Sequence, residues 1–194
     1  IDEIKIILLN EKIKMIIGLT GKNAAGKGEL AEHLKSKGFT YFSLSDALRD
    51  EATSRGLDHS REVLIKLGTE MREKFGKGVL ARRINEKISK VDGNVVVDSI
   101  RHPGEVEELR KNDGFVLIGV HTDAKIRFER LLKRGRIGDA KNFEEFIEYE
   151  NRENNNEGSG QQMDKCMELV DKVINSDGTI EEANKDLDLY LQNA

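Results

Sequence analysis

The stretch GKNAAGKG at residues 21–28 matches the pattern G-x-x-x-x-G-K. Glycines at these positions let backbone N–H groups turn inward around an anion, and Lys27 can reach the outer phosphate oxygens of a nucleotide. Residues 14–19 (KMIIGL) come before the pattern and predict a buried strand. Residues 26–37 follow it and predict a helix, whose N-terminus would add partial positive charge at the loop. This context favours a phosphate-binding loop over a plain glycine-rich turn.

We expect the loop to hold the phosphates of ATP through the following residues: Gly21, Lys22, Asn23, Ala24, Ala25, Gly26, Lys27, Gly28 and Glu29. One position departs from the common pattern. Gly28 stands where such loops usually carry Ser or Thr, and Glu29 follows it. Neither residue has a hydroxyl group for Mg²⁺, so metal contact from this loop would have to pass through water.

The rest of the chain alternates between apolar runs and helical patterns. Further strands are predicted at residues 41–44, 95–98, 115–120 and 173–174, and helices at residues 46–55, 63–75, 79–91, 105–111, 125–133, 143–152 and 180–191. Strands that alternate with helices predict a parallel sheet covered by helices on both faces. Residues 151–162 (NRENNNEGSGQQ) are polar and predict a loop. We expect one domain over residues 1–194, with residues 1–14 as an N-terminal extension.

Composition narrows the functional classes. The 194 residues carry a net charge of −4, which argues against a general binder of long nucleic acids. The single cysteine, Cys166, excludes an intrachain disulfide and a multi-thiolate metal site, and fits a reducing compartment. The early apolar run at residues 6–9 is too short for a membrane span or a signal peptide. We therefore expect a cytoplasmic protein with a small-molecule partner.

Two residues after the second predicted strand suit the acceptor of a transferred group. Asp46 and Arg49 are three positions apart and share one helix face. The arginine could form a forked contact with a phosphate, and the aspartate could orient an acceptor oxygen or take its proton. The alternative for Asp46 is a role as a helix cap.

The strand at residues 95–98 ends in an acid, Asp98, which could hold Mg²⁺ through water. Arg101 follows three residues later and would project from the same sheet edge as Lys27, where it could bind a second phosphate. His102 is expected to be a surface turn residue.

A basic stretch follows the fourth predicted strand. Six basic residues fall within residues 125–136: Lys125, Arg127, Arg130, Lys133, Arg134 and Arg136. The next stretch, residues 142–157, has six glutamates and one arginine. Two solvated helix faces would explain this pattern. A mobile lid over residues 125–160, whose Arg130, Arg134 and Arg136 close over the transferring phosphoryl group, would explain it as well.

With these elements in place, the chain resembles the nucleoside monophosphate kinase and dephospho-CoA kinase group of P-loop proteins. The segments GLTGKNAAGKG, SLSDALRDEA, VVVDSIRHPGEVEEL and VINSDGTIEEANKDL carry the resemblance. LGTEMREKFGKGVLARRI and GQQMDKCMELVDKVI are most similar to the kinase-like domain fused to some deoxycytidylate deaminases. The resemblance implies an α/β three-layer P-loop NTPase fold, a sheet order of 2-3-1-4-5, ATP with Mg²⁺, and a closing lid.

Three functions stay open at this point. The first is transfer of the ATP γ-phosphoryl group to a nucleoside or deoxynucleoside monophosphate, with Arg49 and Arg101 on the acceptor phosphate. The second is phosphorylation of a hydroxyl, as in dephospho-CoA, with Asp46 as general base. The third is a regulatory module that binds nucleotide with little turnover, which the missing loop hydroxyl favours.

Overall fold

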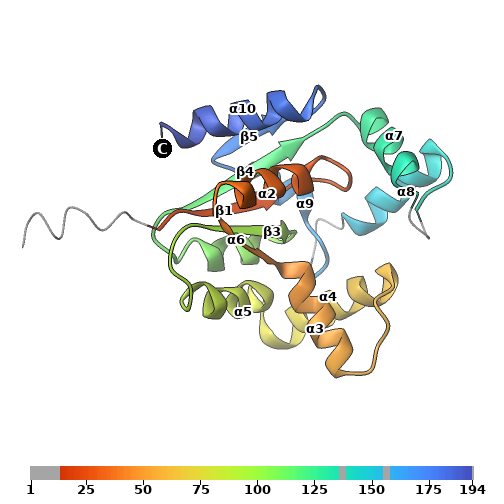
Figure 1. Cartoon of the computed structure of the whole chain (residues 1–194). Helices are drawn as coiled ribbons and strands as arrows, with labels where there is room; N and C mark the ends of the chain where they lie inside the picture. The colour runs from red at the N-terminus through yellow and green to blue at the C-terminus, as the bar shows by residue number, and fades with distance from the viewer. Residues whose placement is uncertain (1–13, 136–138, 155–157, 194) are drawn as a thin grey trace, which may run out of the picture.

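Five parallel strands form one sheet in the computed structural model, which describes residues 14–135, 139–154 and 158–193 (Figure 1). The strands are β1 (Ile16–Thr20), β2 (Thr40–Ser43), β3 (Val95–Ile100), β4 (Phe115–His121) and β5 (Lys172–Asn175). Their order is β2-β3-β1-β4-β5. The predicted parallel sheet and its 2-3-1-4-5 order are therefore confirmed.

Nine helices are described around the sheet: α2 (Lys27–Ser36), α3 (Leu44–Ser54), α4 (Arg61–Phe75), α5 (Val79–Ile88), α6 (Pro103–Leu109), α7 (Ala124–Arg134), α8 (Phe143–Glu153), α9 (Met163–Glu168) and α10 (Ile180–Leu191). None of these described helices is long and apolar enough to cross a membrane.

Strand β1 lies in the middle of the sheet, and every residue of it is buried. Ile16 pairs with Val95 on one side and with Phe115 on the other. Side chains of a strand alternate between the two faces of a sheet, so β1 contributes to two separate cores. Ile16 packs with α3, α4, α5, α6 and α9, whereas Ile17 and Leu19 pack with α2 and α10. The molecule is therefore three layers, helix on sheet on helix.

A third, smaller cluster lies beside the sheet. Leu131 of α7 and Phe146 of α8 are its large buried residues, and the rings of Phe128 and Phe143 pack around Phe146 at centroid distances of 5.7 and 6.2 Å. Helices α7 and α8 lie together at one end of the molecule (Figure 1). They thus form a unit with its own small core.

Several boundaries differ from those predicted. Helix α3 starts at Leu44 rather than residue 46, because the Ser43 side chain accepts a hydrogen bond of 3.2 Å from the Ser45 backbone N–H and caps the helix there. Strand β3 runs two residues past Asp98. Helix α9 was not predicted, since its six residues are too few to show a helical period.

The N-terminal extension predicted for residues 1–14 lies outside the described residues, apart from Lys14. The Lys14 ammonium group donates to the backbone carbonyls of Ile88 and Val91, each at 2.6 Å, and so joins the chain before β1 to the end of α5.

Candidate functional site

The loop between β1 and α2 has the backbone that an anion-binding turn requires. Gly21, Ala24 and Gly26 have φ angles of 142°, 59° and 101°. Such positive φ angles favour glycine, and Ala24 is strained there. A Cβ atom on Gly26 would lie 2.7 Å from the Ser176 hydroxyl oxygen, and one on Gly21 would lie 2.4 Å from the Val120 carbonyl oxygen. Both glycines are therefore needed for close approach as well as for their angles.

Lys27 is the first residue of α2, and its side chain folds back over the loop. The ammonium group donates to the backbone carbonyls of Gly21 at 2.6 Å and Lys22 at 2.9 Å. Burial lowers the pKa of Lys27 to about 8, against the opposing effect of the nearby Asp98 carboxylate. Because the Lys27 ammonium group is partly shielded from water, an anion beside it would stabilise its charged form.

The next two positions face outward. Gly28 and Glu29 are both exposed, and a Cβ atom built on Gly28 would meet nothing within 4 Å. The first turn of α2 thus has room for a side chain at residue 28 but supplies no hydroxyl group there.

Asp98 lies in β3, next to β1, and is held by its own neighbours. Its carboxylate accepts hydrogen bonds from the Ser99 backbone N–H at 2.6 Å and from the Tyr41 hydroxyl at 3.4 Å. Ser99 has a φ of 66°, so the strand distorts directly after the acid. The structure, over the residues that it describes, has no group of three or more His, Cys, Asp or Glu side chains able to hold a metal ion. A cation at Asp98 would need most of its ligands from water or from a nucleotide.

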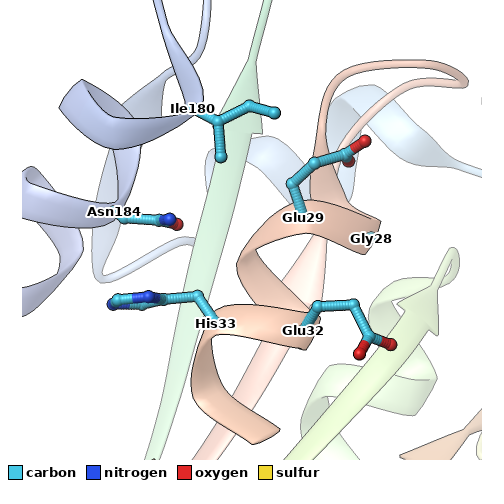
Figure 2. Close-up of a pocket in the computed structure, with 6 residues that line it drawn as sticks. All are labelled: Gly28, Glu29, Glu32, His33, Ile180 and Asn184. Carbon is cyan, nitrogen blue, oxygen red and sulfur yellow. The ribbon is translucent and has the colours of Figure 1, made fainter. Parts of the chain in front are cut away.

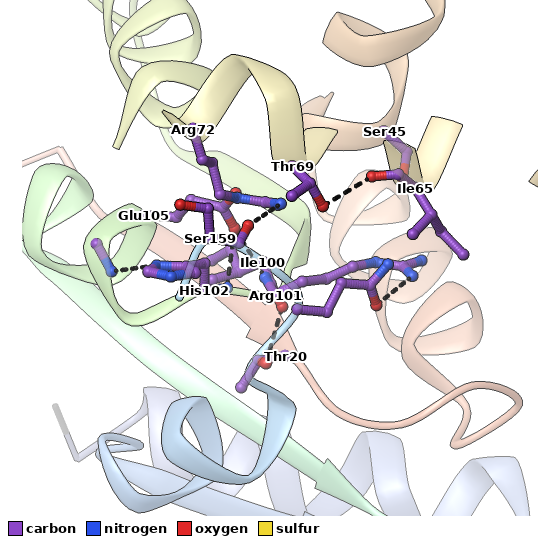
Figure 3. Close-up of polar contacts among 12 residues, drawn as sticks. Thr20, Ser45, Ile65, Thr69, Arg72, Ile100, Arg101, His102, Glu105 and Ser159 are labelled. Carbon is purple, nitrogen blue, oxygen red and sulfur yellow. Dashed lines mark hydrogen bonds and ion pairs between the residues drawn. The ribbon is translucent and has the colours of Figure 1, made fainter. Parts of the chain in front are cut away.

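Arg101 follows Ile100, the last residue of β3, which pairs with Thr20 at the end of β1, next to the loop. The charges of Asp98 and Arg101 both act on the pKa of Lys27, although burial has the larger effect. Burial lowers the pKa of the Arg101 guanidinium, while the Glu153 and Asp98 carboxylates oppose that effect. The guanidinium donates to the Gln161 side-chain oxygen at 3.1 Å (Figure 3). The structure therefore brings Lys27, Asp98 and Arg101 together at the carboxyl ends of β1 and β3.

Asp46 and Arg49 face each other on α3, as their spacing predicts. One guanidinium nitrogen of Arg49 lies 2.6 Å from a carboxylate oxygen of Asp46, and both side chains are about half exposed. Asp46 is close enough to Tyr41 to help raise the pKa of that phenol, although burial contributes more. In this structure the two charges of the pair satisfy each other.

A buried carboxylate fixes the turn that carries Arg101. Glu105 is fully buried, and one of its oxygens accepts hydrogen bonds from Arg72 of α4 at 2.8 and 3.0 Å (Figure 3). The other oxygen accepts from the backbone N–H groups of Arg101 at 2.8 Å and His102 at 3.1 Å. The Arg72–Glu105 pair thus sets the backbone position of Arg101.

The prediction for His102 was wrong. Its side chain is buried and caps α6, where Nδ1 accepts a hydrogen bond of 3.0 Å from the Gly104 backbone N–H. Sequence reasoning also missed Glu105. The spacing of His102 and Glu105 is that of a capping box, and this signal could have revealed both roles.

Arg127 belongs to the basic stretch that the sequence predicts to be either a solvated helix face or part of a lid. In the structure its side chain is buried and holds α7 and α8 together. It forms an ion pair with Glu150 of α8. It also donates to the Thr122 carbonyl at 2.9 Å and to the Asn23 carbonyl of the loop at 3.3 Å. One side chain therefore links α7, α8 and the phosphate-loop candidate.

Two of the three arginines predicted to belong to a lid lie close to the same loop. Arg130 donates to the Ser176 carbonyl at 2.5 Å, beside Gly26. Arg134 donates to the Asn23 side chain at 3.4 Å and pairs with Asp139 at 3.0 Å. Arg136 lies outside the described residues.

A separate pocket opens between α2 and α10 (Figure 2). It has a volume of ≈ 320 Å³ and is lined by Gly28, Glu29, Glu32, His33, Ile180 and Asn184. Gly28 and Glu29 of the predicted loop line it, whereas Lys27, Asp98 and Arg101 do not, so the pocket lies apart from these three residues.

Known proteins are similar to this chain in sequence. A family model described as an AAA domain matches residues 17–157. A UPF0200 protein of Pyrococcus abyssi is 35% identical over 184 residues, which cover 92% of this chain and 96% of the relative. A UPF0200 protein of Pyrococcus horikoshii is 34% identical over 180 residues, which cover 90% and 94%.

Solved structures share the fold at low sequence identity. A shikimate kinase from Bacteroides thetaiotaomicron aligns with a TM-score of 0.63 at 14% identity, covering 92% of this chain and 98% of the kinase. TT1252 from Thermus thermophilus aligns with a TM-score of 0.62 at 21% identity, covering 94% and 98%. The fold is thus that of P-loop kinase-like proteins.

Proposed function

Since this chain belongs to the family of the AAA domain model and to the UPF0200 proteins, and has a P-loop kinase-like fold, we propose that it transfers the γ-phosphoryl group of ATP to a nucleoside or deoxynucleoside monophosphate. One observation carries the proposal: Lys27, Asp98 and Arg101 lie together at the carboxyl ends of two adjacent parallel strands. In open α/β sheets this edge is where ligands bind.

The loop residues fit the phosphates of ATP. Gly21 and Gly26 leave the backbone open to close approach, and the positive φ angles at Gly21, Ala24 and Gly26 are those of a turn whose N–H groups can face an anion. Lys27 would exchange its two carbonyl partners for phosphate oxygens, which are stronger acceptors. Residues Gly21 to Glu29 would therefore hold the donor.

Asp98 fits Mg²⁺ as a partner through water. Bound Mg²⁺ would neutralise charge on the transferring group. Gly28 and Glu29 offer it no hydroxyl, so Asp98 would be the chief protein group near the ion.

Arg101 and Arg49 would hold the acceptor phosphate. Two anionic groups must approach each other during transfer, and guanidinium groups reduce that repulsion. Arg101 is already fixed by Glu105, whereas Arg49 would have to leave Asp46. The freed Asp46 carboxylate could then orient the acceptor.

Arg130, Arg134 and Arg136 would stabilise the charge of the transferring group from a lid over residues 125–160. Arg134 already contacts Asn23 of the loop, which supports this role. The resemblance to nucleoside monophosphate kinases, and to the kinase-like domain fused to some deoxycytidylate deaminases, favours a nucleotide as acceptor.

The test is a panel of nucleoside and deoxynucleoside monophosphates incubated with the protein, ATP and Mg²⁺. We expect ADP and one diphosphate product, both lost in Lys27→Met. Tight ATP binding without product from any acceptor would reject the kinase activity.

Phosphorylation of a hydroxyl is a second candidate, because Asp46 lies in the first turn of α3, directly after β2, with a carboxylate that could act as base. Asp46→Asn would then nearly abolish turnover. For a phosphate acceptor the same change should matter much less.

A nucleotide-binding module with little turnover is a third candidate, favoured by the absent hydroxyl at Gly28. Such a module would bind ATP with an affinity that barely depends on Mg²⁺. A kinase of the proposed kind would bind and react in a Mg²⁺-dependent way.

A further inference from the structure

Arg61, which the motifs of the sequence do not include, makes a forked contact with Glu153. The guanidinium Nε lies 2.5 Å from one carboxylate oxygen, and Nη2 lies 2.7 Å from the other. This two-point geometry is also the one in which arginine binds phosphate. The contact joins the first residue of α4 to the last residue of α8.

The pair lies next to Arg101. Asn154, the residue after Glu153, forms a β-bridge with Gln161, and the Gln161 side-chain oxygen accepts a hydrogen bond of 3.1 Å from Arg101. The Glu153 carboxylate accordingly opposes the effect of burial, which lowers the pKa of Arg101. Arg61 therefore holds a carboxylate that lies close to Arg101. The Glu153 side chain is 18% exposed, so water reaches this place.

Glu153 is the last residue of α8, a position where the helix disfavours a negative charge. The C-terminal end of a helix carries partial negative charge, which repels a carboxylate there. Arg61 lies at the N-terminal end of α4, where an anion is favoured. The charge of Glu153 thus depends on partners that an anionic ligand would also use.

We propose that Arg61 is a further binding residue for the phosphate group of the acceptor, and that the Glu153 carboxylate fills this place in the free protein until the acceptor displaces it. The inference rests on the proposed function and deepens it. It predicts that the acceptor is an anion and that its phosphate group binds between Arg61 and Arg101. Displacement would release the end of α8 from α4, so that arrival of the acceptor is coupled to the helices that carry the lid arginines.

Inorganic phosphate is a suitable probe, because its binding requires neither ATP nor turnover. It would be titrated into the full chain and followed by nuclear magnetic resonance. The Nε–H signals of Arg61 and Arg101 report on this place, the signal of Arg101 also in variants that lack Arg61, and the amide signals of Gly21 and Gly26 report on the loop. Arg61→Gln identifies the Arg61 signal by its loss.

Glu153→Gln should strengthen phosphate binding at Arg101 and Arg61 by roughly five- to tenfold, because the internal competitor loses its charge. Arg61→Gln should weaken binding there at least tenfold while the loop amides respond as in the parent protein. Arg61→Lys keeps the charge but not the forked contact, so it should bind phosphate more weakly than the parent protein and more tightly than Arg61→Gln.

Glu70→Gln is the matched control. Glu70 is also a carboxylate on the surface that pairs with an arginine, Arg55, at 2.9 Å, and it should leave phosphate binding unchanged. Equal or weaker binding in Glu153→Gln, with unchanged thermal unfolding, would overturn the inference. So would an Arg61 signal that phosphate does not move. Turnover with a monophosphate alongside either result would leave the proposed function standing and remove only the role of Arg61.

Discussion

At the scale of single residues, Lys27 links the chemistry of the site to pH. With a pKa of about 8, its ammonium group is charged below pH 8 and begins to lose its proton above it. A bound phosphate favours the charged form, so above pH 8 the free protein must take up a proton in order to bind. We expect ATP affinity to be constant below pH 8 and to fall by up to about tenfold per pH unit above it.

Calorimetric titration between pH 7 and pH 9.5, in buffers of different ionisation enthalpy, would measure both the affinity and the proton uptake. Lys27→Arg is the control, because arginine stays protonated throughout this range. Its affinity, relative to its own value at pH 7, should not change. The same slope in both proteins would assign the titration to another group.

Gly28 offers a direct test of the missing hydroxyl. The position has open space around it, so both Gly28→Ala and Gly28→Ser should fold. Each should stabilise α2 by up to about 1 kcal/mol, alanine more than serine, because glycine is a poor helix former. Only serine can contact Mg²⁺, so only Gly28→Ser should increase the Mg²⁺ dependence of ADP binding. Equal Mg²⁺ dependence in the two variants would contradict this prediction.

The sequence predicted the candidate residues whose positions follow from local spacing. Lys27 belongs to a motif, and Asp98 and Arg101 follow directly from the end of a strand. Arg61 and Glu153 are far apart in the chain, and no local pattern predicts their contact. Arg127 was missed for a different reason. It stands in a run of basic residues that is typical of a solvated helix face, and only the fold shows that this one is buried.

At the scale of elements, the buried Arg127 holds α7 and α8 to the loop between β1 and α2. Removal of one partner of a buried ion pair leaves the other charge unpaired, so Arg127→Met should lower the free energy of unfolding by about 3–5 kcal/mol. Urea unfolding followed by circular dichroism would measure this.

Arg110→Met is the control, because Arg110 pairs with Asp171 on the surface, where both side chains are about 40% exposed. Arg110→Met should lower the free energy of unfolding by less than about 1 kcal/mol. A similar cost for both variants would show that Arg127 does not act as a buried charge.

The long elements were predicted well because their periods are strong. Residues 180–191 were predicted as a helix, and α10 has these bounds. The short α9 was missed, since Met163 and Cys166 are held by tertiary packing rather than by a local pattern. Strand order came from the resemblance, because pairing partners such as Ile16 and Val95 cannot be read from either segment alone.

At the scale of the whole molecule, the separate core of α7 and α8 predicts separate opening. Phe146→Ala removes the buried aromatic ring of that cluster and should lower its local free energy of opening by about 3–5 kcal/mol. Hydrogen exchange should speed up in α7 and α8 and stay unchanged in β1 and β4. Leu19→Ala, in the main core, should instead speed up exchange throughout the sheet. Uniform acceleration by Phe146→Ala would contradict independent opening.

The central position of β1 also determines when the sheet can form during synthesis. Within the described part of the chain, β1 pairs with β3, which begins at Val95, and with β4, which begins at Phe115. A nascent chain therefore carries an apolar β1 without these partners until the residues of β3 have left the ribosome. The loop between β1 and α2 can reach its final position only after that, although its sequence lies directly after β1.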